Sequence, residues 1–127
     1  MELVIVIIAL ALIQYQVFGF LVGRARGKYD VPAPAMIGDP IFERYNRVHQ
    51  NTQESLMLFI PGMMMFGYYI NPTIAAGLGV IWLIGRILYL RSYVKEPTTR
   101  AVGFLLTFAP NVILVIGGAI SAAMALF

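Results

Sequence analysis

Long apolar runs separated by short polar breaks dominate the chain. The first run covers residues 3–22 and contains no charged side chain. About twenty residues at 1.5 Å rise cross a hydrocarbon core of roughly 30 Å, so we expect this run to be a membrane-spanning helix. It is too long for the apolar core of a typical signal peptide, and it follows Glu2 rather than a basic segment. We therefore expect it to remain in the protein as its first helix.

Proline-containing breaks divide the rest of the chain into three further helical segments. Proline fixes its own φ and disfavours the helical conformation in the residue before it, so Asn71-Pro72 and Glu96-Pro97 each end a helix. The connector at residues 23–40 contains three prolines and is expected to be a loop. The later helices are expected at residues 41–70, 73–94 and 98–127. The pattern thus predicts an all-α, four-helix integral membrane bundle formed by a single domain of residues 1–127.

The second helix differs from the others because only its later half is apolar. Charged and amide side chains fill residues 43–54, and apolar side chains dominate from Leu56 onward. Such a helix is expected to start outside the bilayer and to enter it part way along. Since the break at Asn71-Pro72 is short, the second and third helices are expected to form an antiparallel hairpin.

Composition supports the membrane assignment and excludes several kinds of site. The 127 residues are 60% hydrophobic and 12% charged, whereas soluble domains hold about 45–50% apolar and about 25% charged residues. The chain has no cysteine and one histidine, His49, which excludes disulfides, thiolate metal ligands and multi-histidine metal centres. We therefore expect no metal cofactor. The net charge of +3 comes from basic residues at helix ends, so we do not expect nucleic acid to bind.

Basic residues gather at alternate connectors, and this pattern predicts the orientation of the helices. The first connector and its flanks carry Arg24, Arg26, Lys28, Arg44 and Arg47, and the third connector and its flanks carry Arg91, Lys95 and Arg100. The connector between the second and third helices carries no charge. Because cytoplasmic loops carry an excess of lysine and arginine, we expect the first and third connectors in the cytoplasm and both termini outside.

Two sets of polar residues each share one face of a helix. The spacings i, i+4, i+7 and i, i+3, i+7 place side chains on one face. The set in the second helix is Arg47, Asn51 and Glu54, and the set in the third helix is Arg86, Tyr89 and Tyr93. Arg100 follows the Pro97 break. Ionisable residues within membrane segments are functional candidates because their insertion is costly.

Simpler roles are open for each of these residues taken alone. Arg47 and Arg100 can extend to lipid phosphates while their stems stay in apolar surroundings. Glu54 can be the structural ion-pair partner of an arginine. Tyr89 and Tyr93 can belong to the aromatic belt at the membrane–water interface. No single residue therefore defines a site.

The combination of these residues points to a small ligand that carries charges of both signs. Arginine side chains hold carboxylates through two parallel hydrogen bonds, and Glu54 is suited to an ammonium group. A peptide with two carboxylates and one amine fits this set of groups. Glutathione is such a peptide.

At these positions the sequence resembles the family of membrane-associated proteins in eicosanoid and glutathione metabolism (MAPEG), in particular the branch of leukotriene C synthase and microsomal glutathione transferase 3. The motifs that carry the resemblance are Phe42-Glu43-Arg44, Arg47-x-x-x-Asn51-x-x-Glu54 and Arg86-x-x-Tyr89-x-x-x-Tyr93, followed by Arg100. The likeness runs from the first connector to the start of the fourth helix, and the outer helices match in apolarity alone. Both motifs at this separation are fairly specific, whereas either one alone is weak.

The resemblance implies a homotrimer in which neighbouring subunits share three glutathione sites near the cytoplasmic side. The positions that match glutathione-binding residues of the family are Arg26, Arg47, Asn51, Glu54, Arg86, Tyr89 and Tyr93. Arg100 matches the arginine that activates the thiol. The resemblance thus implies a membrane glutathione S-transferase, with glutathione as co-substrate and membrane lipid as its surroundings.

The role implied for Arg100 has a clear chemical basis. A free cysteine thiol has a pKa of about 8.5, and the thiolate is the nucleophile. A guanidinium within hydrogen-bonding reach favours the anion and lowers that pKa. A shift of about two units would leave the bound thiol largely ionised at neutral pH. The thiolate is then expected to attack a lipophilic electrophile or a lipid hydroperoxide.

Three positions depart from the leukotriene C synthase pattern. Ser55 stands in place of a tyrosine that contacts glutathione, His49 in place of a glutamine, and Gly27 in place of a second arginine. These departures favour a broader detoxifying transferase or peroxidase over leukotriene synthesis. Because the sequence ends at Phe127 within the fourth helix, we expect a compact prokaryotic member in a bacterial inner membrane.

Two other classes of protein stay open as alternatives. The first is a member of the family that has lost catalysis and acts as a regulatory or lipid-binding membrane protein. The second is a small multidrug exporter, which also has four short helices. Such exporters typically need a membrane-embedded acid in the first helix, where this chain offers only Gln14.

Overall fold

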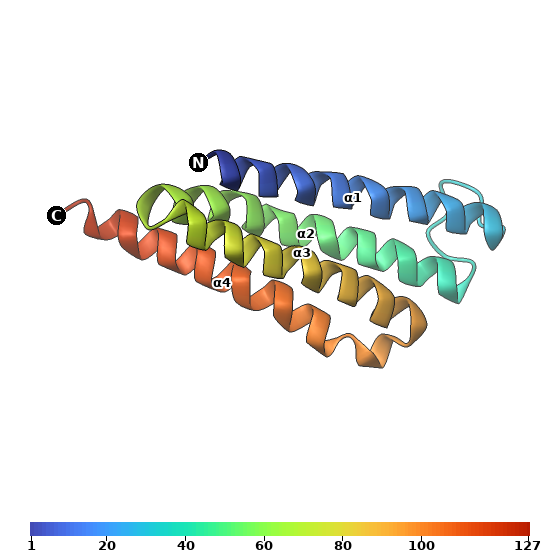
Figure 1. The fold of residues 1–127 in the computed structure, drawn as a ribbon. Helices are drawn as coiled ribbons and strands as arrows, with labels where there is room; N and C mark the ends of the chain where they lie inside the picture. Colours follow the sequence, from blue (N-terminus) through green and yellow to red (C-terminus); the bar gives the residue numbers. More distant parts are fainter.

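The computed structural model describes residues 1–127 and contains four long α-helices and no strand (Figure 1). The helices are α1 (Glu2–Lys28), α2 (Pro40–Tyr69), α3 (Pro72–Lys95) and α4 (Ala101–Met124), with a short 3₁₀ turn, η1, at Pro97–Thr99. The prediction of an all-α, four-helix bundle is confirmed.

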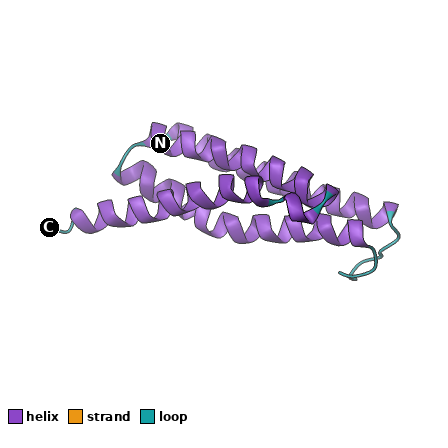
Figure 2. Ribbon diagram, turned by 90° about the horizontal axis from the view of Figure 1, so that it is seen from below, coloured by secondary structure: helices purple, strands orange, loops and turns teal.

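The helices run side by side along one long axis (Figures 1 and 2). Both chain termini and the turn between α2 and α3 lie at one end of the bundle, and the other two connections lie at the opposite end (Figure 1). The two basic connectors therefore lie at the same end of the bundle. The side of the membrane that this end faces stays a prediction.

Three of the four helices are long and apolar enough to cross a membrane, namely α1, α3 and α4. Helix α2 is not among them because its first half is polar. That half nevertheless lies beside the apolar run of α1, since Val48 packs with Phe18 and the His49 ring stacks on Tyr15 at 4.3 Å. The polar segment of α2 therefore extends to a depth where its neighbour is apolar.

Helix α1 continues to Lys28 rather than ending near Val22. The apolar run ends at Val22, but no proline stops the helix before Pro32. Cationic side chains near a helix C-terminus interact favourably with the helix dipole. As a result, the first connector shortens to residues 29–39, and the basic residues predicted to lie in it form the last turns of the helix.

Side-chain caps fix the starts of α2 and α3. The Oδ1 atoms of Asp39 and Asn71 each accept hydrogen bonds from two backbone N–H groups of the following turn, at 2.8–3.0 Å. Pro40 and Pro72 occupy the first helical position, where the missing N–H group costs no helical hydrogen bond. The fourth helix starts at Ala101 rather than Thr98, because Pro97–Thr99 forms the 3₁₀ turn, and it ends at Met124.

Close approach of α4 to its neighbours depends on glycines on both sides. A Cβ atom added to Gly85 of α3 would lie 2.7 Å from the Leu106 Cβ of α4. A Cβ added to Gly103 of α4 would lie 2.4 Å from the backbone nitrogen of Tyr89 in α3. Helix pairs in membranes commonly approach through such small residues. The contact between Gly103 and Tyr89 is important for the candidate site, because it fixes the start of α4 against α3.

Candidate functional site

The predicted residues of α2 and α3 meet through Arg86. Its side chain is 0% exposed, and its Nη1 donates to Asn51 Oδ1 at 2.8 Å and to Thr52 Oγ1 at 3.2 Å. Its Nη2 donates to Thr107 Oγ1 of α4 at 3.2 Å. One guanidinium therefore links three helices.

The surroundings of Arg86 stabilise a buried charge without a carboxylate. Its guanidinium carbon lies 4.4 Å from the centre of the Tyr89 ring, a distance at which the aromatic face attracts a cation. The hydroxyls of Thr52 and Thr107 also donate to the backbone carbonyls of Val48 and Phe104. Their oxygen lone pairs are thereby oriented toward Arg86. Arg86 has no exposed surface in the structure, so in this arrangement its influence on a ligand passes through Asn51.

The outward face of α2 carries an ion pair between Arg47 and Glu54. The Arg47 Nη1 and Glu54 Oε1 atoms are 3.4 Å apart, and the two side chains are 50% and 63% exposed. The neighbouring Gln53 side chain reaches the hydroxyl of Tyr15, which lies inside the apolar run of α1. The exposed Arg47–Glu54 ion pair therefore lies at the same level along the bundle as the apolar run of α1.

A groove between α2 and α4 begins at this outward face. Its volume is about 160 Å³, and it is lined by Asn51, Glu54, Ser55, Leu58, Phe104, Thr107, Phe108 and Asn111. Because Asn51 Oδ1 is held by Arg86, its amide nitrogen is the part of the side chain left for a ligand. The groove thus places an amide donor beside the carboxylate of Glu54.

Sequence reasoning did not assign Thr107 and Asn111 to the site, and it considered Ser55 only as a departure. Asn111 is the one amide side chain in a largely apolar helix, and this was the only sequence signal for its role. Its Nδ2 donates to Ser55 Oγ at 2.9 Å, and Trp82 Nε1 donates to the same oxygen at 2.9 Å. Ser55 therefore accepts hydrogen bonds from two buried donors.

Ser55→Ala is expected to lower the free energy of unfolding by about 1–3 kcal/mol, because two buried donors would lose their shared acceptor. Thermal unfolding in detergent, followed by the emission of the single tryptophan, measures this loss. Ser92→Ala on α3 is the control, because no hydrogen bond from its hydroxyl forms in the structure. Equal stability of the Ser55 and Ser92 variants would contradict the assigned hydrogen bonds.

The two tyrosines of α3 stack on one another beside the start of α4. Their ring centres are 5.6 Å apart, and the rings are within 13° of parallel. Tyr89 is buried, and Tyr93 is half-buried. The Arg86 guanidinium carbon lies 4.4 Å from the centre of the Tyr89 ring, so the stacked pair adjoins the buried arginine.

Arg100 lies at the entrance to α4 and is exposed. Its one side-chain hydrogen bond runs from Nη1 to the backbone oxygen of Pro97, at 3.5 Å. It lines a surface hollow with Thr98, Ala101 and Phe104, and Phe104 also lines the groove between α2 and α4. The hollow that Arg100 lines therefore adjoins the groove at Phe104, and most of the N–H donors of Arg100 have no partner in the structure.

Arg26 contacts none of the other predicted site residues. Its Nη1 donates to the backbone oxygens of Ala35 at 2.6 Å and Val31 at 3.3 Å, and its guanidinium carbon is 4.7 Å from the centre of the Phe42 ring. These contacts hold the first connector against the ends of α1 and α2. Arg26 is not among the residues that line the groove between α2 and α4.

Fold and site together define a class of protein: a multi-pass helical membrane protein with a polar, cation-rich site on the outer face of its bundle. Residues 4–120 match the MAPEG family, and the chain belongs to that family. The resemblance read from the motifs is thereby confirmed, and the apolar helices with the family membership make the chain an integral membrane protein.

Several relatives share most of the chain. It is 49% identical to an uncharacterized protein of Synechocystis over 115 residues, which are 91% of this chain and 84% of the relative. It is 38% identical to human microsomal glutathione S-transferase 2 over 110 residues, 87% of this chain and 75% of the relative. Leukotriene C4 synthase of Cavia porcellus is 32% identical over 83 residues, which cover 65% of this chain and 55% of that protein.

Proposed function

We propose that the chain is a membrane glutathione S-transferase. In this proposal, glutathione binds on the outward face of α2 and in the groove beside α4. Arg100 holds the sulfur as a thiolate for attack on a lipophilic electrophile or a lipid hydroperoxide. Relatives named microsomal glutathione S-transferase 2 in human and cattle, at 38% and 36% identity, support a glutathione-dependent transferase.

The observation that carries the proposal is the exposed ion pair of Arg47 and Glu54 beside the apolar run of α1. A charged side chain at the centre of a membrane helix costs about 2.5–3.5 kcal/mol on insertion scales. Such side chains therefore face other protein, water or a ligand rather than lipid. A bound zwitterionic peptide together with a neighbouring subunit would provide these surroundings.

The groups on this face are complementary to glutathione. The planar guanidinium of Arg47 can bind a carboxylate through two hydrogen bonds, and Glu54 can accept hydrogen bonds from an ammonium group. Asn51 offers its amide nitrogen to a peptide carbonyl, because Arg86 occupies its oxygen. The present pair distance of 3.4 Å is long for a charge-assisted hydrogen bond. Little free energy is therefore lost when the Arg47–Glu54 pair breaks and each side chain binds an oppositely charged group of the ligand instead.

The neighbouring subunit is expected to contribute Arg26. This arginine lies apart from the other predicted ligands within one subunit, so its predicted role in glutathione binding requires a second copy of the chain. A homotrimer with sites between subunits meets this requirement, and it would also cover the exposed polar face of α2. We place the sites at the cytoplasmic side of a bacterial inner membrane, where the basic connectors are expected.

Two reactions are compatible with a thiolate at this position. In conjugation, the sulfur forms a bond to an electrophilic carbon, and the displaced group leaves with the electron pair. In peroxide reduction, the sulfur attacks one oxygen of the hydroperoxide, and the O–O bond breaks. The products are an alcohol, after protonation, and a sulfenic acid, which a second glutathione converts to the disulfide and water. Arg100 lowers the pKa of the thiol in both cases.

An ultraviolet difference spectrum of glutathione added to the purified protein in detergent tests the proposal. The wild type is expected to show a thiolate band at neutral pH, and Arg100→Ala is expected to lose it. A change of about two pKa units corresponds to about 2.7 kcal/mol of thiolate stabilisation. Arg91→Ala removes an exposed cation from the same end of the bundle and is expected to keep the band.

Two results would contradict the proposal. If the folded wild type shows no thiolate band, the transferase proposal is rejected and a regulatory or lipid-binding role is favoured. A band of equal strength in the Arg100→Ala variant would show that Arg100 does not stabilise the thiolate.

A further inference from the structure

Four cations that the candidate site does not use lie along the last turns of α1 and α3. They are Arg24 and Lys28 of α1, and Arg91 and Lys95 of α3, and all four are exposed. The structure has two ion pairs, Met1 with Glu2 and Arg47 with Glu54, so none of these four cations has a carboxylate partner. Their charge is therefore available to an anion from outside the subunit.

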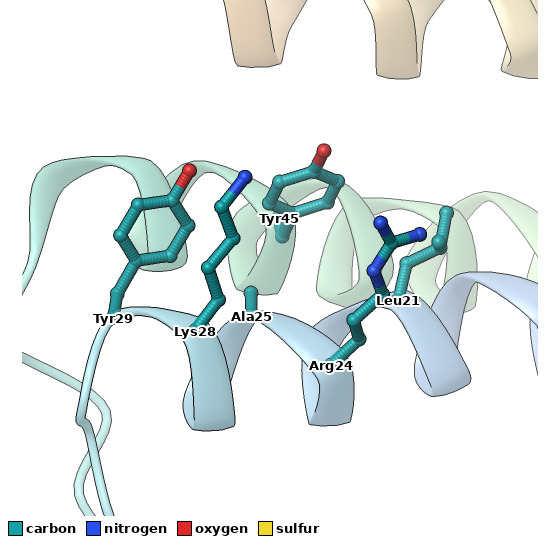
Figure 3. Close-up of a pocket in the computed structure, with 6 residues that line it drawn as sticks. All are labelled: Leu21, Arg24, Ala25, Lys28, Tyr29 and Tyr45. Carbon is teal, nitrogen blue, oxygen red and sulfur yellow. The ribbon is translucent and has the colours of Figure 1, made fainter.

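The two cations of α1 line a pocket of about 90 Å³ with the phenols Tyr29 and Tyr45. Figure 3 shows the side chains of Lys28, Tyr29 and Tyr45 with their polar ends pointing the same way. The Lys28 amine lies 5.4 Å from the centre of the Tyr29 ring. One side of this pocket thus presents an ammonium, a guanidinium and two hydroxyl groups together.

The two cations of α3 line an adjoining pocket of about 250 Å³ that shares Leu21 and Tyr45 with the first. The two pockets therefore form one groove between α1 and α3, with Tyr45 of α2 at its base. We call it the α1–α3 groove. Cations stand on both of its walls, so an anion in the groove would have positive charge on two sides.

Beside Tyr45, the floor of the α1–α3 groove is apolar. Leu21 and Leu90 line it and pack against the buried cluster of Phe18, Val48 and Tyr89. Val17 and Ile87, one helical turn deeper on α1 and α3, are exposed apolar residues that extend along the same faces. A ligand in the groove would therefore meet cations at one end and hydrocarbon further in.

We propose that the α1–α3 groove binds the headgroup of an anionic phospholipid. The phosphate would lie between the cations of the two walls with the tyrosine hydroxyls as donors, and the first acyl methylenes would lie on the apolar floor. Basic pockets between membrane helices are established places for such headgroups. The apolar floor favours a lipid over a soluble phosphate. The proposal does not depend on the glutathione site, which lies on the outward face of α2.

Native mass spectrometry of the detergent-purified protein, titrated with phosphatidylglycerol or phosphatidylcholine, tests the proposal. We expect phosphatidylglycerol to bind more tightly than phosphatidylcholine. Lys28→Gln and Lys95→Gln, one from each wall, are each expected to weaken phosphatidylglycerol binding about fivefold. Arg100→Gln removes the same charge from the same end of the bundle but outside the groove, and it is expected to leave the affinity unchanged. Unchanged tryptophan emission and melting temperature confirm that each variant is folded.

Three outcomes would overturn the proposal. An equal loss of affinity in all three variants would mean that general surface charge attracts the lipid. Equal binding of phosphatidylglycerol and phosphatidylcholine would mean that the lipid's charge plays no part. Displacement of phosphatidylglycerol by an equal concentration of inorganic phosphate would make the groove a site for a soluble anion.

Discussion

Gly103→Leu is expected to destabilise the bundle by about 3 kcal/mol or more, above the usual range for overpacking a core. The reason is that an added Cβ atom would lie 2.4 Å from the backbone nitrogen of Tyr89 and 2.6 Å from its Cα atom. A flexible side chain can move aside from such a contact, but the backbone of a neighbouring helix cannot. The start of α4 would have to move away from α3. Arg100, just before α4, would then move away from Tyr89.

Thermal unfolding in detergent and glutathione binding together measure this effect. Gly77→Ala is the matched control, because no atom lies within 4 Å of a Cβ added at that exposed position of α3. Alanine is a better helix former than glycine by about 1 kcal/mol, so the control is expected to match or exceed the wild type in stability. A melting temperature for Gly103→Leu equal to that of the wild type would contradict the close crossing of α3 and α4.

The sequence predicted the number and order of the helices because apolar length and proline position are local signals. Pro40 and Pro72 start helices within one residue of the predicted positions. The end of α1 was predicted too early, since the boundary of an apolar run is not the boundary of a helix. A helix can continue past the apolar segment that crosses the bilayer, and α1 continues past its apolar run through Arg24, Arg26 and Lys28.

The candidate site was predictable where it depends on helical periodicity. The i, i+7 spacing placed Arg47 and Glu54 on one face, and the structure pairs them at 3.4 Å. Thr52 and Thr107 gave no such signal, because a threonine that bonds its own helix backbone is common in membrane helices. Thr52 and Thr107 belong to the site because both accept hydrogen bonds from Arg86. This contact depends on how three helices pack together, which residue spacing within one helix does not predict.

Arg86 illustrates how the structure changes the interpretation of a predicted residue. The family resemblance implied that Arg86 binds glutathione, and that role stays a prediction. In the structure all of its side chain is buried, and its Nη1 donates a hydrogen bond to the oxygen of Asn51. These contacts favour a positioning role, in which Arg86 selects the orientation of the Asn51 amide.

Arg86→Ala is expected to lower the free energy of unfolding by about 3–5 kcal/mol, the range for removing a large buried side chain. The substitution would leave a cavity among α2, α3 and α4 and would remove the hydrogen bonds that join them. Thermal unfolding in detergent measures the loss. Arg91→Ala on the exposed face of α3 is the control and is expected to unfold at the wild-type temperature.

Arg86→Met separates positioning from folding. Replacing a buried charge by an apolar side chain of similar length is often neutral for stability, and Thr52 and Thr107 keep their backbone acceptors. We therefore expect a folded protein with a melting temperature close to that of the wild type. Asn51 would lose the partner that fixes its amide, and glutathione affinity is expected to fall about tenfold or more, since a hydrogen bond to a charged group contributes about 1.5–3 kcal/mol. Calorimetric titration with glutathione measures the affinity. Unchanged affinity in a folded Arg86→Met protein would exclude both a positioning role and direct contact, and would leave Arg86 as a purely structural link between the helices.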